Sequence, residues 1–147
     1  MMSHVNDGLR EFRLSLVVKP SELPGVRRIV RAHLRLWGLQ ELIEDTLEIA
    51  TELLTNVHRH AGGRAVLLLQ RSPGLLRITV SDRSPRMPVV KRPDWTSLTG
   101  RGMFLVDALA DEWKAVPTET GKDVCATLTL PSGRALPVLA ELARWSV

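Results

Sequence analysis

The first strong pattern along the chain is an alternation of apolar and polar positions. Between residues 12 and 18 the sequence reads FRLSLVV, in which every second residue is a large apolar one. A period of two predicts a strand with one face toward a core and one face in water. The residues before it, 1–11, are largely polar and are predicted to be a frayed N-terminus. The remainder, 12–147, is predicted to form a single domain.

Apolar residues at three- and four-residue spacing then predict two amphipathic helices. The first is closed by Gly38, and the second runs from about Gln40 to Ala61, where Gly62 and Gly63 end it. Their expected core positions are Val26, Ile29, Val30, Leu34 and Trp37 in the first helix and Leu42, Thr46, Ile49, Leu53 and Val57 in the second. Arginines occupy the opposite side of the first helix.

The second half of the chain is predicted to contain mostly strands. Its expected elements are a strand hairpin at 65–70 and 75–82, a long loop at 83–101, a buried helix at 103–110, strands at 114–117 and 124–130, and a final helix at 136–145. Strands and helices are therefore partly segregated along the chain. This order predicts an α+β protein, a two-layer α/β sandwich with a mixed, mostly antiparallel sheet and helices on one face.

Charge and composition exclude several classes of protein. The chain has 147 residues and a net charge of +4, yet residues 41–60 carry five acidic and one basic side chain. An acidic block at the centre argues against a DNA-binding domain, which the pI of 10.0 would otherwise suggest. Cys125 is the single cysteine, so neither an internal disulfide nor a cysteine zinc cluster is expected. No apolar run could span a membrane, and a cytoplasmic protein is expected.

Candidate chemistry begins on the second predicted helix. Glu52 and Asn56 are four residues apart and share one face, which Arg59 and His60 extend by a turn. A carboxylate can serve as a general base, an amide oxygen can bind Mg²⁺, and an arginine can neutralise phosphate. An ordinary solvated helix face is the other interpretation of these residues.

Two more features could bind a ligand. Gly100-Arg101-Gly102 precedes the predicted helix at 103–110, where free backbone N–H groups and the helix dipole favour an anion. Asp82 ends a predicted strand and could accept hydrogen bonds from a ligand amine, although aspartates also commonly start turns. A loop ending in a glycine-capped helix is likewise common without any ligand.

The order of these features resembles the GHKL superfamily of histidine-kinase-like ATPases. The sequence ELLTNVHRHA at 52–61 resembles its N-box, and Asp82 stands where the family has its adenine-reading aspartate. GRGMFLV at 100–106 is similar to the second glycine box, and GKDVCATL at 121–128 to the closing glycine-led strand. The likeness covers about residues 12–131. It is strongest to the single-domain anti-sigma-factor serine/threonine kinases, and it implies a Bergerat-type ATP-binding fold.

The resemblance implies a role for each of these residues. Glu52 would be the general base, Asn56 would bind Mg²⁺, and Asp82 would accept from the adenine amino group of ATP. The phosphates would be held by a group of basic residues and backbone amides, namely Arg59, His60, Gly100, Arg101, Gly102 and Met103. Residues 83–99 would act as a lid. The implied partners are an anti-sigma-factor antagonist, a sigma factor or both, with a possible homodimer and no direct contact with nucleic acid or membrane.

Departures from the family pattern keep more than one function open. The family's first glycine box lacks its glycines here, since Arg83-Ser84-Pro85-Arg86 follows Asp82, and Arg83 and Arg86 are expected to supply side-chain contacts instead. Asp123 stands near the closing glycine, where the family often has threonine. The expected function is phosphate transfer from Mg-ATP to a serine or threonine of the antagonist. The alternative is a catalytically weak nucleotide-binding module that acts through protein contacts, and a basic DNA-binding domain is the third, weaker hypothesis.

Overall fold

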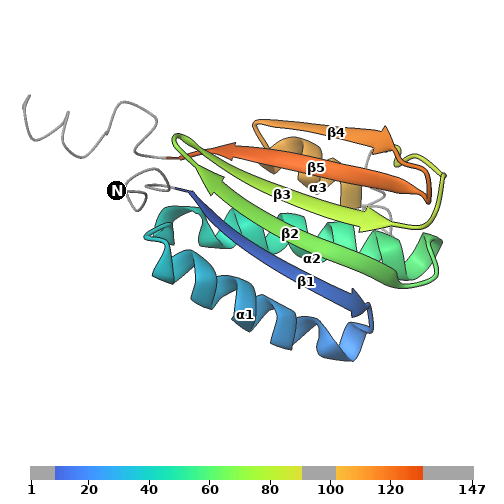
Figure 1. Ribbon diagram of the computed structural model, residues 1–147, viewed down its shortest axis with the longest axis horizontal. Coiled ribbons are helices and arrows are strands. Elements are labelled where there is room, and N and C mark those ends of the chain that lie inside the picture. The colour runs from blue at the N-terminus through green and yellow to red at the C-terminus, as the bar shows by residue number, and fades with distance from the viewer. Residues whose placement is uncertain (1–8, 91–101, 131–147) are drawn as a thin grey trace, which may run out of the picture.

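The computed structural model describes residues 9–90 and 102–130. In chain order its strands and helices are β1 Arg10–Val17, α1 Leu23–Leu36, α2 Ile43–His60, β2 Arg64–Ser72, β3 Leu75–Asp82, α3 Gly102–Leu109, β4 Glu112–Pro117 and β5 Lys122–Thr129 (Figure 1). Short 3-10 turns at Pro20–Glu22 and Gln40–Leu42 lead into α1 and α2. The predicted final helix at 136–145 lies outside the described residues.

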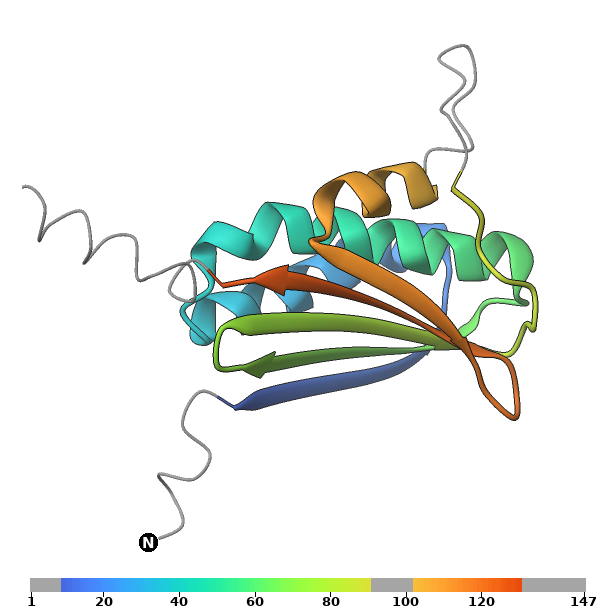
Figure 2. The same cartoon turned by 90° about the horizontal axis from the view of Figure 1, so that it is seen from above.

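The strands form one five-stranded sheet in the order β1-β2-β3-β5-β4. All four neighbouring pairs are antiparallel, so the described sheet is not mixed as predicted. Figure 2 shows α1, α2 and α3 on one face of this sheet. The predicted α+β fold, a two-layer sandwich with helices on one face, is confirmed.

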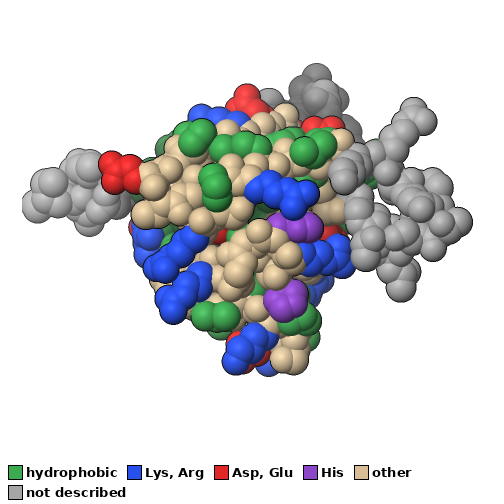
Figure 3. Space-filling model, turned by 90° about the vertical axis from the view of Figure 1, so that its right-hand side faces the viewer, with side chains coloured by type: hydrophobic (Ala, Val, Ile, Leu, Met, Phe, Trp, Pro, Cys, Tyr) green, Lys and Arg blue, Asp and Glu red, His purple; other side chains and the backbone are tan. Residues whose placement is uncertain are grey.

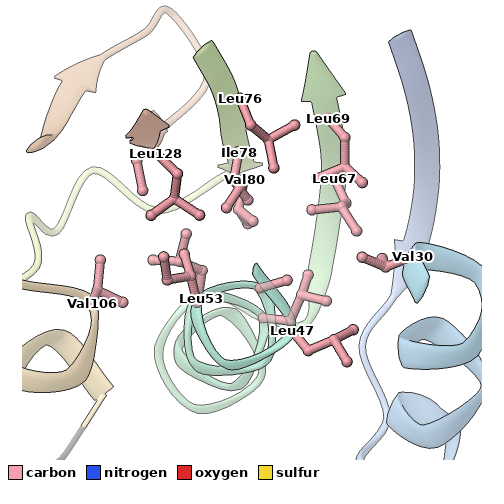
Figure 4. Packing of buried hydrophobic residues seen from close by; sticks show 14 of the residues in the cluster. Val30, Leu47, Leu53, Leu67, Leu69, Leu76, Ile78, Val80, Val106 and Leu128 are labelled. Atoms are coloured by element: carbon pink, nitrogen blue, oxygen red, sulfur yellow. The ribbon is translucent and has the colours of Figure 1, made fainter. Parts of the chain in front are cut away.

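The core lies between the sheet and α2. Alternate residues of β2 and β3 point toward the helices, and the register pairs Leu67 with Val80 and Leu69 with Ile78. Figure 4 shows these side chains above Leu53 of α2, with side chains of α1 and α3 on either side. All the predicted core positions of the second helix are buried, namely Leu42 in the turn that leads into α2 and Thr46, Ile49, Leu53 and Val57 in α2 itself. In α1 the pattern holds except at Ile29, which is 40% exposed.

Two other expectations differ from the structure. β1 begins at Arg10, because Arg10 pairs with Arg71 and Glu11 with Gln70, so these two residues are not frayed. In α3 only Met103 and Val106 are buried, so the helix has one buried side and is not surrounded by core.

Cys125 is half-buried and not part of the core. It alternates with Val124 and Ala126, which point toward the helices, so its own side chain lies on the other face of the sheet. Of the four tryptophans, Trp37 is buried and Trp113 half-buried, whereas Trp95 and Trp145 lie outside the described residues. No helix in the described part of the chain is long and apolar enough to cross a membrane.

Candidate functional site

A cavity of about 520 Å³ opens at one end of the sandwich. Its walls come from the second half of α2, the end of β3, the segment that follows β3, the beginning of α3 and the beginning of β5. In Figure 1 this is the right-hand end, where α2 and β3 both finish and β5 starts. Elements that are distant in sequence therefore meet around one hollow.

Glu52 and Asn56 form the α2 side of the cavity and are both half-buried. They face Gly102, the first residue of α3. A Cβ atom placed on Gly102 would lie 3.2 Å from Asn56 Oδ1 and 3.3 Å from Glu52 Oε2. A glycine at this position therefore lets the N-terminal end of α3 approach a carboxylate and an amide oxygen closely.

The outer rim of the cavity is basic. Arg59 and His60 from the last turn of α2 and Arg86 from the segment after β3 all line it. Figure 3 looks onto this end of the molecule and shows histidine side chains close to those of Lys and Arg. His58 has a different role, since its Nδ1 lies 3.1 Å from the Val18 carbonyl oxygen at the end of β1. A basic rim of this kind suits an anionic ligand.

The inner end of the cavity holds a buried ion pair. Lys122 Nζ lies 2.9 Å from Asp82 Oδ2 and 3.1 Å from Asp82 Oδ1, and the two side chains are only 7% and 4% exposed. The two residues are directly opposite each other in the register of β3 and β5. Asp82 is therefore neutralised inside the protein. The walls on either side are apolar and are formed by Leu53, Val57, Val80, Met87, Pro88, Val89, Met103, Leu105 and Val124.

Close backbone packing holds this pair in place. A Cβ atom at Gly121 would lie 2.6 Å from Arg83 Cα and would also clash with the carbonyl oxygen of Asp82. Only glycine permits this approach of the start of β5 to the end of β3. The Ser84 backbone N–H also donates to Asp82 Oδ1 at 2.8 Å, which turns the chain away from the sheet.

Most of the residues singled out in the sequence share this cavity. Those that line it are Glu52, Asn56, Arg59, His60, Asp82, Arg86, Gly102 and Met103. Arg83 is exposed and does not line it. Its backbone packs against Gly121, and among the described residues 83–90 it is Arg86 whose cation lines the cavity. Gly100 and Arg101 lie outside the described residues, as does the greater part of the predicted lid.

Lys122 is the site residue that sequence reasoning missed. The sequence pattern could have identified it, because Lys122 is in phase with the alternate residues Val124, Ala126 and Leu128 of the same strand. The side chains of these three residues all point into the core. A lysine at an inward position of a strand needs a counter-charge, and Asp82 is the buried carboxylate within reach. The sequence alone does not give the register that brings the two together.

The described residues of the cavity offer few ligands for a metal ion. Among the described residues there is no group of three or more His, Cys, Asp and Glu side chains that could hold a metal ion. Asn56 and Glu52 do offer oxygen atoms to a hard cation. This set suits Mg²⁺ delivered with a phosphate ligand, because Mg²⁺ takes few protein ligands and keeps several waters.

The family model for the histidine kinase-like ATPase domain matches residues 16–128. The chain belongs to this family. The match spans the elements from β1 to β5 and so includes every described wall of the cavity. Membership in the histidine kinase-like ATPase family supports a role in ATP binding.

Solved structures show the same fold for this histidine kinase-like ATPase domain. One match is the crystal structure of the RsbU and RsbW domains of Rv1364c from Mycobacterium tuberculosis, with a TM-score of 0.62 and 19% sequence identity. The similarity covers 82% of this chain but 32% of that chain, so the domain spans about a third of its neighbour. A search of curated proteins found no match.

Proposed function

We propose that this domain binds Mg-ATP in the cavity and transfers the γ-phosphate to a serine or threonine of an anti-sigma-factor antagonist. Such a reaction would regulate transcription by partner switching, in which the domain binds either the antagonist or a sigma factor. The observation that carries the proposal is the placement of Glu52 and Asn56 against the first residue of α3 inside one cavity. The proposed partners are the antagonist, a sigma factor or both, and a homodimer is also proposed.

The proposed reaction gives Glu52 the role of general base. Its carboxylate takes the proton from the partner's hydroxyl while that oxygen forms a bond to the γ-phosphorus. The bond between the γ-phosphorus and the bridging oxygen breaks, and ADP leaves with the bridging oxygen. Phosphoryl transfer depends mainly on positioning and charge neutralisation, so a single base beside a phosphate site is sufficient protein chemistry.

The proposed phosphate site lies between the basic rim and the start of α3. Arg59, His60 and Arg86 would neutralise the triphosphate, and the free N–H groups of α3 would donate to it. Asn56 would bind Mg²⁺, which supplies charge neutralisation at the phosphates when bound. The apolar walls of the cavity would contact the base and exclude water from it.

A catalytically weak nucleotide-binding module is the second candidate function. It is favoured by the segment after Asp82, where Ser84 and Arg86 stand in place of glycines and Ser84 N–H closes a turn on the aspartate. Backbone cannot approach a phosphate as closely there as it can at glycine. In that case the work of the domain would be protein interaction controlled by the nucleotide.

Calorimetry with Mg-ATP tests the binding step. We expect saturable binding of one nucleotide per chain, and absence of binding at millimolar ATP would overturn the proposal for the cavity.

Phosphate transfer is tested with Glu52→Gln, which keeps the size of the side chain and removes the base. We expect ATP binding to persist and transfer to fall by about a hundredfold or more.

Glu44→Gln is the matched control for this substitution. Glu44 lies on the same helix, is exposed and does not line the cavity. It should leave both binding and transfer at the wild-type level. Transfer that survives in Glu52→Gln would remove Glu52 from the role of base, and binding without any transfer in the wild-type protein would select the second candidate function.

A further inference from the structure

Lys122 breaks an otherwise apolar row of side chains on β5. The inward positions of this strand are Lys122, Val124, Ala126 and Leu128, and all of them are buried. Lys122 is 6% exposed as a whole residue and lies at the point where the row reaches the cavity. A buried lysine is rarely found without a partner, so its ammonium group defines the polar chemistry at this end of the cavity.

The hydrogen-bonding capacity of this ion pair is largely used within the protein. The ammonium has three N–H donors, and it has three acceptors in Asp82 Oδ1, Asp82 Oδ2 and the Ser84 carbonyl oxygen, the last at 3.3 Å. Asp82 Oδ1 also accepts the backbone N–H of Ser84. A ligand that reaches the inner end of the cavity therefore meets a closed, electrically neutral group and not a free carboxylate.

We propose that Lys122 is a specificity-determining residue that makes this cavity bind 6-amino and 6-oxo purine nucleoside triphosphates with similar affinity. This inference rests on the proposed function, since it concerns the base end of the same nucleotide site. A free Asp82 carboxylate would accept from the amino group of adenine and repel the carbonyl oxygen of a 6-oxo purine. Paired with Lys122, it does neither strongly.

The neutral amine of adenine is a poor competitor for the ammonium. The ammonium adds a Coulomb attraction to its hydrogen bonds with the carboxylate, and a neutral amine has no such attraction. Displacing Lys122 would also leave its charge buried without a counter-ion, since both side chains are almost fully buried. The base is instead held by apolar contacts with residues such as Val80 and Val124, which do not distinguish an amino group from a carbonyl.

The test compares the affinities of Mg-ATP and Mg-ITP by calorimetry, because inosine carries a 6-oxo group where adenosine carries a 6-amino group. For the wild-type protein we expect the two dissociation constants to agree within about threefold. In Lys122→Met, the freed carboxylate should favour ATP over ITP by about tenfold, as expected for one good hydrogen bond. Lys114→Met is the matched control, because it removes the same charge from an exposed position of β4 outside the cavity and should leave the ratio unchanged.

Lys122→Met leaves a buried carboxylate without a counter-ion and is expected to be less stable than wild type. The double substitution Asp82→Asn with Lys122→Met removes both charges, so we expect it to be more stable than Lys122→Met alone. Its amide can donate as well as accept, so its ratio should return to within about threefold. The wild-type ratio needs no variant and is by itself a test.

A wild-type preference for ATP of tenfold or more would overturn the role of Lys122 while leaving the proposed function intact. An unchanged ratio in Lys122→Met would do the same. If ATP binds to Lys122→Met but neither nucleotide binds to the wild-type protein, the ion pair closes the base site, and the inference that the wild-type cavity binds both nucleotides is overturned. If neither protein binds either nucleotide, the proposed function fails and the inference falls with it.

Discussion

Two threonines of α2 carry the same side chain in different surroundings. Thr46 is fully buried among apolar residues, and its Oγ1 has no hydrogen-bond partner among the described residues. Thr51 lies at the contact with α1, where its Oγ1 accepts from Arg27 Nη1 at 2.8 Å. A buried hydroxyl without a partner lowers stability, whereas one that accepts from a guanidinium group contributes to it.

Replacing each hydroxyl by a methyl group separates the two cases. Thr46→Val should raise the free energy of unfolding by about 1 kcal/mol, because it removes the unpaired buried hydroxyl and keeps the shape of the side chain. Thr51→Val should lower it by about 1 kcal/mol through loss of the contact with Arg27. Urea denaturation measures both, and a change of the same sign in the two variants would contradict this account.

At the scale of the elements, periodicity predicted α2 and the hairpin of β2 and β3 well, because one face of each is buried. The core stripe of α2 follows the 3.6-residue period from Thr46 to Val57. The one-sided burial of α3 could not be predicted in the same way. Its apolar residues face both α2 and the cavity, and apolar side chains that line a cavity look like core residues in a sequence.

The residues of the candidate site also differ in whether local sequence patterns could place them. Glu52 and Asn56 could be placed on one helix face from their spacing alone, and Asp82 from the end of its strand. Lys122 could not be assigned to Asp82, because that contact depends on the register of two strands separated by the whole of α3 and β4. Arg83, which was expected to contact the nucleotide, is exposed and does not line the cavity, whereas Arg86 does, and the sequence alone could not distinguish these two arginines.

The approach of β5 to β3 depends on the absence of a side chain at residue 121. Gly121→Ala should lower the free energy of unfolding by about 2 kcal/mol or more, since the new methyl group meets backbone atoms that cannot move independently. Gly25→Ala is the control, because its Cβ would lie in ordinary contact, 3.7 Å from Arg28 Nη2, within α1. That substitution should raise stability by about 0.5–1 kcal/mol.

Thermal unfolding of the two alanine variants checks this prediction. The two substitutions add the same methyl group, so opposite shifts of Tm would reflect the two backbone environments alone. Equal shifts would show that the start of β5 can move away from Asp82. In that case the ion pair of Lys122 and Asp82 would not depend on close backbone packing.

At the scale of the whole molecule, the fold brings acidic and basic residues from several elements together at one end of the sandwich. The acidic residues of 41–60 lie in α2 and its leading turn, and Glu48 and Glu52 of this block line the cavity. Basic residues from α2 and from the segment after β3 form the rim. The net charge of +4 is thus compatible with an anion site at this end, next to a carboxylate that would repel phosphate unless a cation accompanied it.

The cavity exists only in the folded chain, because its walls come from α2, α3, β3 and β5. A ligand that binds there must therefore stabilise the protein by mass action. At a free Mg-ATP concentration of one hundred times its dissociation constant, the free energy of unfolding should rise by about 2.7 kcal/mol. Each further tenfold increase in Mg-ATP concentration should add about 1.4 kcal/mol.

Urea denaturation at increasing Mg-ATP concentrations measures this increase in the free energy of unfolding, with magnesium sulfate at equal ionic strength as the control. If calorimetry detects binding but the urea midpoint does not move, the nucleotide binds the unfolded chain equally well, and the cavity is not its site.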